Sequence, residues 1–323
     1  MTTERGFALI VVLLVMTIVG VVGAEFAYSM RLEAAAVRAY KDGILGGHLA
    51  EAAVAQATRE IVAGSGAASA AGPTVVSLDE HGRLTFYTPD RLPLPQLPRD
   101  KVDFEGGQYS YRITDEEARI NLNAAGPDRL DRLLQFCLGL DKSARDVVSD
   151  SLQDWRDPNE EHRLNGAESE DFYLKLPLPY RSHNANLESV TELLQIHGVL
   201  ETPAIYYGTA EQPGLADFVT VRTPPPGQIN INTATKCAMQ TLGLSDAEIS
   251  EIMQSRSLAP YTTSAGRFGG RGFGYATRTF RIEAEGIVNG RVAARLNAIV
   301  QKRTEAVPPV VAILEWSTPR ESR

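Results

Sequence analysis

An uninterrupted apolar run near the N-terminus constrains this chain more than any other feature of its sequence. Residues Phe7 to Ala24 include no charged side chain, and the run lies between Arg5 and Glu25. Eighteen such residues are just enough to cross the hydrocarbon core of a bilayer as one helix. The positive charge of Arg5 before the run favours an N-terminus in the cytoplasm, with the chain after the apolar run on the other side of the membrane. The small residues Val22 to Ala24 leave ordinary secretory cleavage as an alternative.

The bulk composition narrows the function classes. The 323 residues carry 32 basic and 40 acidic side chains, so the chain as a whole does not attract polyanions. Its length makes two packed units the starting expectation. Cys137 and Cys237 are too far apart in sequence for a metal-ligand pair, and they can form a disulfide only where the fold brings them together. Because Cys137 lies beside Leu138 in an apolar helical pattern, an inert buried thiol is expected there rather than a nucleophile.

The first seven residues read MTTERGF, a short polar leader that ends in Gly6 and is followed at once by Phe7 and the apolar run. This arrangement resembles the class III signal of type IV prepilins and type II secretion pseudopilins. The resemblance implies that a prepilin peptidase cleaves between Gly6 and Phe7 and methylates the new N-terminus. An uncleaved signal anchor is the alternative that hydropathy alone allows.

Val11 stands at the fifth position of the expected mature chain, where most members of this family have glutamate. A carboxylate at bilayer depth is retained only where it finds a partner, because its insertion costs about 2.5 to 3.5 kcal/mol. Its absence indicates a subunit with no other subunit ahead of it, as at a filament tip. It is also a feature of the K-type minor pseudopilin of type II secretion systems, which this chain resembles.

The helical composition continues from Glu25 to about Ala63, which predicts one long helix over residues 7–63, with Gly43, Gly46 and Gly47 as places where it could bend. An apolar stripe on this helix is expected to pack in the core. It consists of Val37, Tyr40 and Ile44. The helix is followed by a small-residue linker over 64–72. Short alternating runs at 84–87 and 109–113 then predict strands.

One local element occurs twice downstream. INLNAA begins at Ile120 and leads to Leu138-Gly139-Leu140, and ININTA begins at Ile229 and leads to Leu242-Gly243-Leu244. In both copies an asparagine could cap the following helix, and the glycine allows a tight turn between two helices. Two related helical modules are therefore expected, similar to helix-hairpin-helix or SAM modules.

The C-terminal region alternates again, with Asn289-Gly290 as a hairpin signal and a further strand expected around 310–316. The predicted fold class is α+β: a pilin-like long N-terminal helix packed on a small antiparallel sheet, with a large inserted α-helical domain of two modules. The expected limits are 1–6 for the leader, 7–63 for the helix, 64–113 with 275–323 for the β domain, and 114–274 for the insertion.

The segment from Asp150 to Asp171 holds eight carboxylates against two arginines, Arg156 and Arg163. Together with downstream residues it resembles the DW-x-DP…GAE…YY…N…EL series of the K-type pseudopilin, although Phe172 replaces the first aromatic residue and Asn186 a usual proline. The resemblance implies calcium binding, and carboxylate and amide oxygens suit this ion. A solvated acidic loop is the alternative. The candidate ligands are Asp154, Asp157, Asn159, Glu168, Asp171 and Asn184.

The main competing function is DNA binding, because the second module also resembles helix-hairpin-helix modules that hold phosphates. Acidic residues at the turns, Asp141 and Asp246, argue against it, and the basic residues gather only around Arg267 to Arg281. Motifs of the common hydrolases, nucleotide-binding proteins and zinc enzymes are absent from the sequence, so no enzymatic activity is expected.

The resemblance implies a role as a minor pseudopilin at the tip of a type II secretion pseudopilus, with a type IV pilus tip protein as the alternative. Its expected partners are the I-type and J-type minor pseudopilins, the prepilin peptidase and the inner membrane, with no nucleic acid. The chain is expected to be a single-pass inner-membrane protein whose C-terminal bulk lies in the periplasm.

Overall fold

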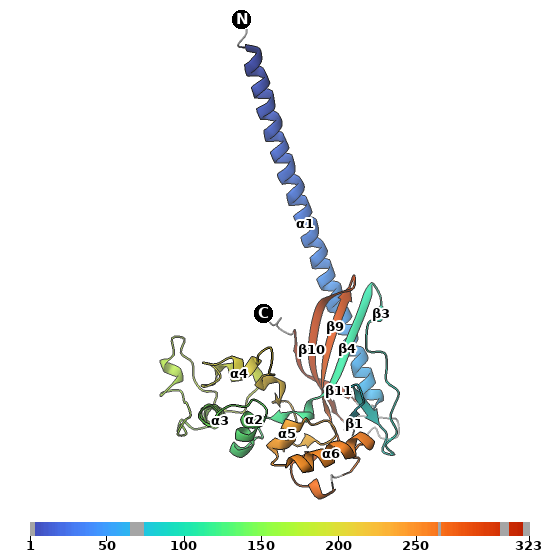
Figure 1. The fold of residues 1–323 in the computed structure, drawn as a ribbon, viewed down its shortest axis with the longest axis vertical. Coiled ribbons are helices and arrows are strands. Elements are labelled where there is room, and N and C mark those ends of the chain that lie inside the picture. The colour runs from blue at the N-terminus through green and yellow to red at the C-terminus, as the bar shows by residue number, and fades with distance from the viewer. Residues whose placement is uncertain (1–3, 65–73, 264–265, 304–309, 319–323) are drawn as a thin grey trace. The chain divides into compact units, whose positions relative to one another are not determined.

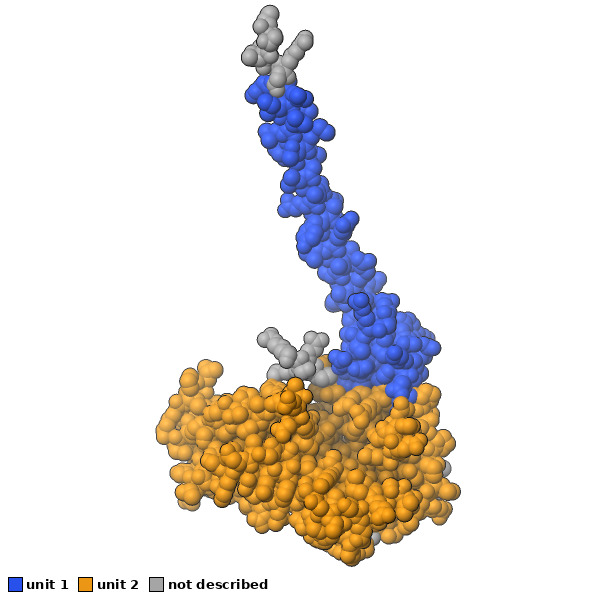
Figure 2. Space-filling view, viewed as in Figure 1, with its two compact units in different colours: residues 1–53, 99–110, 284–296 blue, residues 54–98, 111–283, 297–323 orange. Residues whose placement is uncertain are grey.

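The computed structural model describes residues 4–64, 74–263, 266–303 and 310–318, with side chains from Phe7 onward. It combines one long helix, a five-stranded sheet and a series of short helices (Figure 1). The chain forms two compact units, coloured in Figure 2: residues 1–53, 99–110 and 284–296, and residues 54–98, 111–283 and 297–323. The predicted domain limits at 63, 113 and 274 are a different division of the chain and stay predictions. Most of the expected linker at 64–72 lies outside the described residues.

Helix α1 runs without interruption from Glu4 to Ala63, 60 residues and about 90 Å at 1.5 Å per residue. Its glycines at 43, 46 and 47 do not end it, and the expected single helix is confirmed. Its first part contains a stretch long and apolar enough to cross a membrane. Such a stretch fits a single-pass membrane anchor.

The stripe on α1 does not lie in the core. Val37 is 54% exposed, Tyr40 72% and Ile44 47%, so the prediction that these side chains pack in the core is wrong for this chain by itself. Buried residues of the helix begin at Gly46, where it contacts other elements of its unit. An apolar stripe identifies a face that can pack, but the length of the partner elements decides which part of it does.

Within the first unit, α1 contacts the hairpin formed by β9 (Thr279–Val288) and β10 (Arg291–Arg303) at small residues. A Cβ atom built on Gly46 would lie 2.6 Å from the Cβ of Ala293, and one built on Gly286 would run into the carbonyl oxygen of Gly46. Leu49 and Ala50 are fully buried on the same stretch of helix. The glycines therefore allow the helix backbone to approach the strands closely.

The five-stranded sheet joins segments from both ends of the chain, as the sequence predicts. The two outer strand pairs of the sheet are antiparallel. Strands β9 and β10 are joined by a two-residue turn in which Asn289 (φ 53°) and Gly290 (φ 75°) are both left-handed, the geometry that Asn-Gly favours. The expected strand near 310–316 is the edge strand of the sheet. In order across the sheet the strands are β11 (Val310–Ser317), β10 (Arg291–Arg303), β9 (Thr279–Val288), β4 (Gly107–Asp115) and β3 (Val102–Phe104).

A separate two-stranded antiparallel sheet consists of β1 (Val75–Leu78) and β2 (Leu84–Tyr87). Phe86 of β2 packs against Phe280 of β9, with ring centroids 5.9 Å apart. The expected strand at 84–87 is therefore present, but it belongs to a sheet of its own.

The inserted region contains two related modules, which confirms the repeat read from the sequence. Each begins with a short strand that pairs in parallel with a strand at the module's end: Ile120 with Val219, and Ile229 with Phe273. A 3-10 helix, η1 (Glu116–Ala118), precedes the first module. The first module contains β5 (Ile120–Asn121), α2 (Pro127–Phe136), α3 (Lys142–Arg156), η2 (Tyr173–Lys175), η3 (Val190–Gln195), α4 (Ala204–Tyr207), η4 (Leu215–Asp217) and β6 (Val219–Thr220). The second contains β7 (Ile229–Asn230), α5 (Lys236–Thr241), α6 (Asp246–Leu258), η5 (Gly266–Phe268) and β8 (Phe273–Gly274).

The turns of the two modules match in detail. Gly139 (φ 66°) and Gly243 (φ 74°) are left-handed between the paired helices, as the LGL motifs predict. The repeated asparagines do not cap the helices, and that expectation is wrong. Helix α2 follows Gly126 without a side-chain cap and α5 is capped by Thr235, because both helices begin several residues after the asparagines.

Candidate functional site

Helix α3 positions the first two candidate ligands of the acidic segment. Asp154 lies in its last turn and Asp157 is its C-terminal cap, where Pro158 prevents the helix from continuing. Asp154 is fully buried, because the loop that follows folds back over it. Gly166 permits this closure, since a Cβ atom at that position would run into the Asp154 carboxylate.

A single guanidinium, that of Arg163, contacts both aspartates. Arg163 Nη1 lies 2.5 Å from Asp154 Oδ1 and 2.8 Å from Asp157 Oδ2. The backbone N–H of Arg163 also donates to Asp154 Oδ2 at 3.0 Å. Burial raises the pKa of Asp154, while these contacts to Arg163 oppose the increase. Arg163 was not among the predicted site residues, although it is one of only two arginines in the segment that holds the eight carboxylates.

A chain of hydrogen bonds connects Glu168 and Asn184 through residues that sequence analysis did not select as ligands. Ser182 Oγ donates to Glu168 Oε2 at 2.7 Å and lies 2.7 Å from Ser169 Oγ. Ser169 Oγ and Asn184 Nδ2 both donate to Glu160 Oε1, at 3.2 and 3.0 Å. The network brings Glu160, Glu168 and Asn184 together, although Glu160 and Asn184 are 24 residues apart in sequence.

Two oxygen atoms of this network are buried without a hydrogen-bond partner, Glu168 Oε1 and Asn184 Oδ1. Burial raises the pKa of Glu168 to about 7, and the charges of Asp154, Glu160 and Asp157 add to the increase. Asn184 has a left-handed backbone (φ 50°). Buried acceptors normally have a partner, so these two atoms are available to a cation.

The last two candidates have local partners. Asp171 Oδ1 accepts a hydrogen bond from the Glu168 backbone N–H at 2.9 Å. The Asn159 amide donates to Asp157 Oδ1 at 2.7 Å and accepts from the Glu161 backbone N–H at 2.8 Å. Both side chains therefore shape the loop around the other candidates.

The donor chemistry of the site fits a hard cation, although the carboxylates are not converged on one point. The candidates supply carboxylate and amide oxygens, the ligands that calcium prefers, and two of these oxygens lack partners. Among the described residues no group of three or more His, Cys, Asp or Glu side chains is arranged to hold a metal. Arg163 instead engages Asp154 and Asp157 directly.

The other residues of the DW-x-DP…GAE…YY series form the apolar support of this loop. Trp155 packs edge-on against Tyr173, with centroids 5.2 Å apart, and its indole Nε1 donates to Glu192 Oε2 at 3.3 Å. Phe172 packs on His197, with ring centroids 4.2 Å apart. Replacing the usual first aromatic residue by Phe172 therefore leaves an aromatic contact in place.

The two cysteines form a disulfide, with Cα atoms 5.3 Å apart. The expectation of an inert buried thiol at Cys137 is therefore wrong. Cys137 caps the C-terminus of α2 and Cys237 lies in the first turn of α5, so the bond joins the two modules. Local sequence could not show this, because the pairing depends on how α2 and α5 pack.

Three of the four arginines between 267 and 281 form ion pairs with carboxylates. Arg267 forms an ion pair with Glu251, and Arg271 Nη1 lies 2.6 Å from Glu248 of the α6 capping box. Arg281 forms a two-point ion pair with buried Glu116, at 2.8 and 2.9 Å. These arginines therefore do not present a free basic surface to phosphates.

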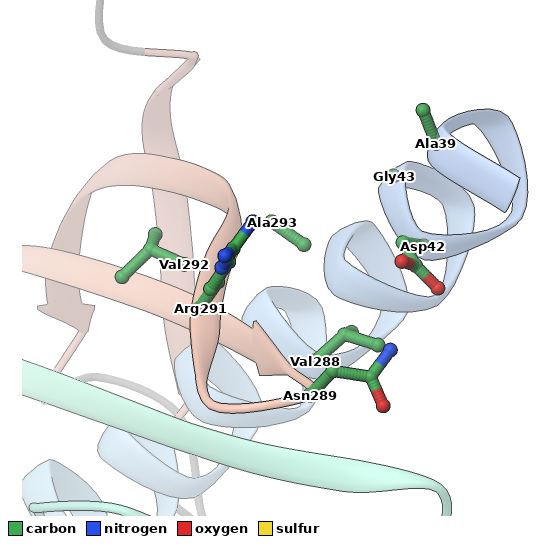
Figure 3. Close-up of a pocket in the computed structure, with 8 residues that line it drawn as sticks. All are labelled: Ala39, Asp42, Gly43, Val288, Asn289, Arg291, Val292 and Ala293. Carbon is green, nitrogen blue, oxygen red and sulfur yellow. The ribbon is translucent and has the colours of Figure 1, made fainter. Parts of the chain in front are cut away.

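A cavity of about 500 Å³ lies between α1 and the β9–β10 turn (Figure 3). It presents one carboxylate, one amide and one guanidinium among small and apolar residues, and its lining includes no histidine, cysteine or hydroxyl that nucleophilic catalysis would use. The lining residues are Ala39, Asp42, Gly43, Val288, Asn289, Arg291, Val292 and Ala293.

The expected processing site lies at the start of α1. Residues 1–3 of the leader lie outside the described residues, and the exposure of Gly6 is not described either. Phe7 is 71% exposed. Cleavage between Gly6 and Phe7 stays a prediction.

Comparisons with known proteins agree on one family. Residues 113–206 match the family model for type II secretion system (T2SS), protein K. A stretch of 116 residues, 32% of this chain, is 28% identical to the type II secretion system protein K of Pectobacterium carotovorum subsp. carotovorum and spans 35% of that protein. The chain therefore matches about a third of the length of this relative.

The fold also resembles a solved structure. A chain in the crystal structure of the GspK–GspI–GspJ complex of the type 2 secretion system of enterotoxigenic Escherichia coli superposes with a TM-score of 0.51 at 16% identity. The match covers 70% of this chain and 84% of that one. The predicted α+β, pilin-like fold class is confirmed, and the K-type resemblance is confirmed over residues 113–206.

Proposed function

We propose that this chain, whose residues 113–206 match the protein K family of type II secretion systems, is a K-type minor pseudopilin. It acts at the tip of a pseudopilus and initiates or caps the assembly that secretes proteins across the outer membrane. One observation carries the proposal: the segment that matches protein K follows a long N-terminal helix, begins in the last residues of β4 and ends before β9 of the same sheet. The role is assembly, without catalysis.

We place the anchor in the inner membrane and the C-terminal bulk in the periplasm. The first part of α1 supports a single membrane crossing. The Cys137–Cys237 disulfide supports an oxidising compartment for the inserted modules, because structural disulfides persist outside the cytosol. A prepilin peptidase then removes residues 1–6 and methylates Phe7.

The proposed partners are the I-type and J-type minor pseudopilins. The solved structure with a similar fold is a complex of GspK with GspI and GspJ, which supports partners of this kind. The exposed stripe of Val37, Tyr40 and Ile44 on α1 offers an apolar face for a neighbouring helix. Packing of a neighbouring helix against this face would bury the three side chains of the stripe, which are exposed in the isolated chain.

Calcium binding to the acidic loop is part of the proposal. Asp154, Asp157, Glu168 and Asn184 would hold the ion, with Asn159 and Asp171 shaping the loop. A bound calcium ion would offset the repulsion among the carboxylates and rigidify the loop. The unpartnered oxygens of Glu168 and Asn184 support this assignment.

Nucleic-acid binding is not part of the proposed function. The ion pairs of Arg267 and Arg271 with Glu251 and Glu248 support its exclusion, since phosphates would have to compete with carboxylates already in place.

The processing step is tested by the intact mass of the full chain extracted from membranes of cells with and without a prepilin peptidase. We expect loss of residues 1–6 and addition of one methyl group only when the peptidase is present. Gly6→Val should block the cleavage, whereas Gly23→Ala, inside the same apolar run, should leave it unchanged. A full-length chain in both strains would show that the protein is an ordinary signal-anchored protein.

Co-purification tests the assembly. The processed full chain, extracted in mild detergent, should bring down the I-type and J-type pseudopilins of the same system, and Tyr40→Asp on the exposed stripe should weaken that recovery. Recovery of neither partner by the unaltered chain would contradict the tip role.

A further inference from the structure

The guanidinium of Arg163 lies where two of the candidate calcium ligands meet. Its Nη1 atom contacts Asp154 Oδ1 and Asp157 Oδ2 at 2.5 and 2.8 Å, and its backbone N–H holds the other oxygen of Asp154. Asp154 is fully buried, so the aspartate depends on this residue for compensation of its charge.

The rest of the site shows an unmet need for positive charge. Glu168 is 1% exposed and its Oε1 atom has no partner, while Glu168, Asp154, Asp157 and Glu160 interact electrostatically as like charges. Asn184 Oδ1, on the same hydrogen-bond network, is likewise buried without a partner. Arg163, in direct contact, and Arg156, which interacts electrostatically with Asp157, supply two positive charges against these four carboxylates, so the cluster stays under-neutralised.

A guanidinium and a divalent cation cannot both compensate the same pair of carboxylates without strong repulsion. At about 4 Å two like charges repel by several kcal/mol at the effective dielectric constant near a protein surface. The side chain of Arg163 is 38% exposed, so it has a route from the aspartates into solvent. Its backbone N–H can stay on Asp154 while the side chain leaves.

We infer that Arg163 is a built-in counter-cation that holds the acidic loop closed in the metal-free chain and that calcium displaces from Asp154 and Asp157. This inference rests on the calcium binding proposed above. Arg163 thus lowers the affinity for calcium and keeps the loop folded before the ion arrives. The loop would consequently be ordered in both states, with its charge supplied by different cations.

Calorimetric titration of calcium chloride into the full chain in detergent micelles tests this role. We expect Arg163→Gln to bind calcium at least about 10-fold more tightly than the unaltered chain, because the competing charge is gone. In chelator the same variant should melt at a lower temperature, since Asp154 has lost its partner, and calcium should restore it. Arg181→Gln is the matched control, because Arg181 pairs with Glu170 at the exposed rim of the same loop.

A second measurement uses the unaltered chain and does not depend on the folding of a variant. An arginine-specific dicarbonyl reagent is added with and without calcium, and modification of Arg163 is followed by mass spectrometry. We expect calcium to increase the modification of Arg163 several-fold and to leave that of Arg181 unchanged. Equal or lower modification, or equal or weaker calcium binding by Arg163→Gln, would overturn the displacement while leaving calcium binding intact. Absence of calcium binding in both chains would instead overturn the proposed metal site and this inference with it.

Discussion

At the scale of single residues, three consecutive acidic side chains at the end of β4 have different environments. Asp115 is buried and accepts hydrogen bonds from Asn230 Nδ2 at 2.7 Å and Thr233 Oγ1 at 2.6 Å. Burial acts to raise the pKa of Glu116, but the Arg281 guanidinium outweighs it and holds the pKa below its usual range. For Glu117, burial and the charge of Asp115 raise the pKa to about 7.

Glu117 therefore predicts a stability that depends on pH. The folded state holds this proton more tightly than the unfolded chain, whose ordinary pKa is 4.5, so the free energy of unfolding falls as the pH rises from about 4.5 to about 7. Glu117→Gln should flatten the dependence, by at most about 3 kcal/mol across the window, because one pKa unit corresponds to about 1.4 kcal/mol. Denaturant unfolding at pH 5 and pH 7.5 measures it. Exposed Glu80→Gln should leave the slope unchanged.

A second residue-scale feature is an arginine repeated in the two modules. Arg156 donates to the carbonyl oxygens of Leu122 and Ala125, and Arg256 donates to those of Ile231 and Ala234, which occupy the same places in the second repeat. Each arginine ties the end of one helix to the turn at the start of its module.

Arg256→Met should lower the free energy of unfolding by about 3 kcal/mol. The variant keeps much of the apolar stem but leaves two carbonyl groups without a charged donor, each such hydrogen bond being worth about 1.5 to 3 kcal/mol. Denaturant unfolding followed by near-ultraviolet circular dichroism measures the change. Arg181→Met, at an exposed ion pair, should cost less than about 1 kcal/mol, and equal losses for both variants would contradict the role.

Among the elements, α1 has two adjacent glycines near the β9–β10 hairpin, Gly46 and Gly47, and only Gly46 is needed for the close approach of the helix to the strands. Gly46 faces Ala293, whereas a Cβ atom on Gly47 would have no other atom within 4 Å. Neighbouring residues of a helix point in different directions, so one glycine is required by packing and the other is not.

The pair provides a matched test. Gly47→Ala should raise the melting temperature of the full chain, because alanine favours a helix over glycine by about 1 kcal/mol. Gly46→Leu should lower it, because its Cβ atom would overlap Ala293 and force α1 away from the strands. Thermal unfolding by circular dichroism in detergent compares them. A similar effect of both variants would show that the close approach contributes nothing.

At the scale of the whole molecule, the disulfide joins segments that are 100 residues apart. The loop that it closes contains the rest of the first module, including every candidate calcium ligand. The bond therefore restricts the unfolded chain strongly and holds α2 against α5 independently of calcium.

Removal of this bond should destabilise the inserted modules substantially. For the double variant Cys137→Ser and Cys237→Ser we expect a loss of up to about 4 to 5 kcal/mol, the chain-entropy value for a closed loop of this length. Unfolding in denaturant measures the loss. A reductant should lower the stability of the unaltered chain and have no effect on the double variant, and insensitivity of both would contradict a stabilising bond.

Features that depend on neighbouring residues could be predicted from the sequence. The apolar run from Phe7 predicts α1 because backbone groups in a bilayer must be satisfied within the segment. Asn289-Gly290 predicts the β9–β10 turn because both positions need a left-handed backbone. The repeated INLN and ININ motifs predict the paired modules, because each repeat encodes the same local turns.

Contacts made through folding could not be predicted from neighbouring residues. The Cys137–Cys237 bond and the exposure of Tyr40 depend on how segments far apart in the sequence pack, and the pairing of Arg163 with Asp154 depends on how the loop after α3 folds back. The candidate ligands could be listed from their oxygen chemistry, but their burial and partners could not. Charges interact through space, so the cation that pairs with a buried carboxylate can be identified only in the folded structure.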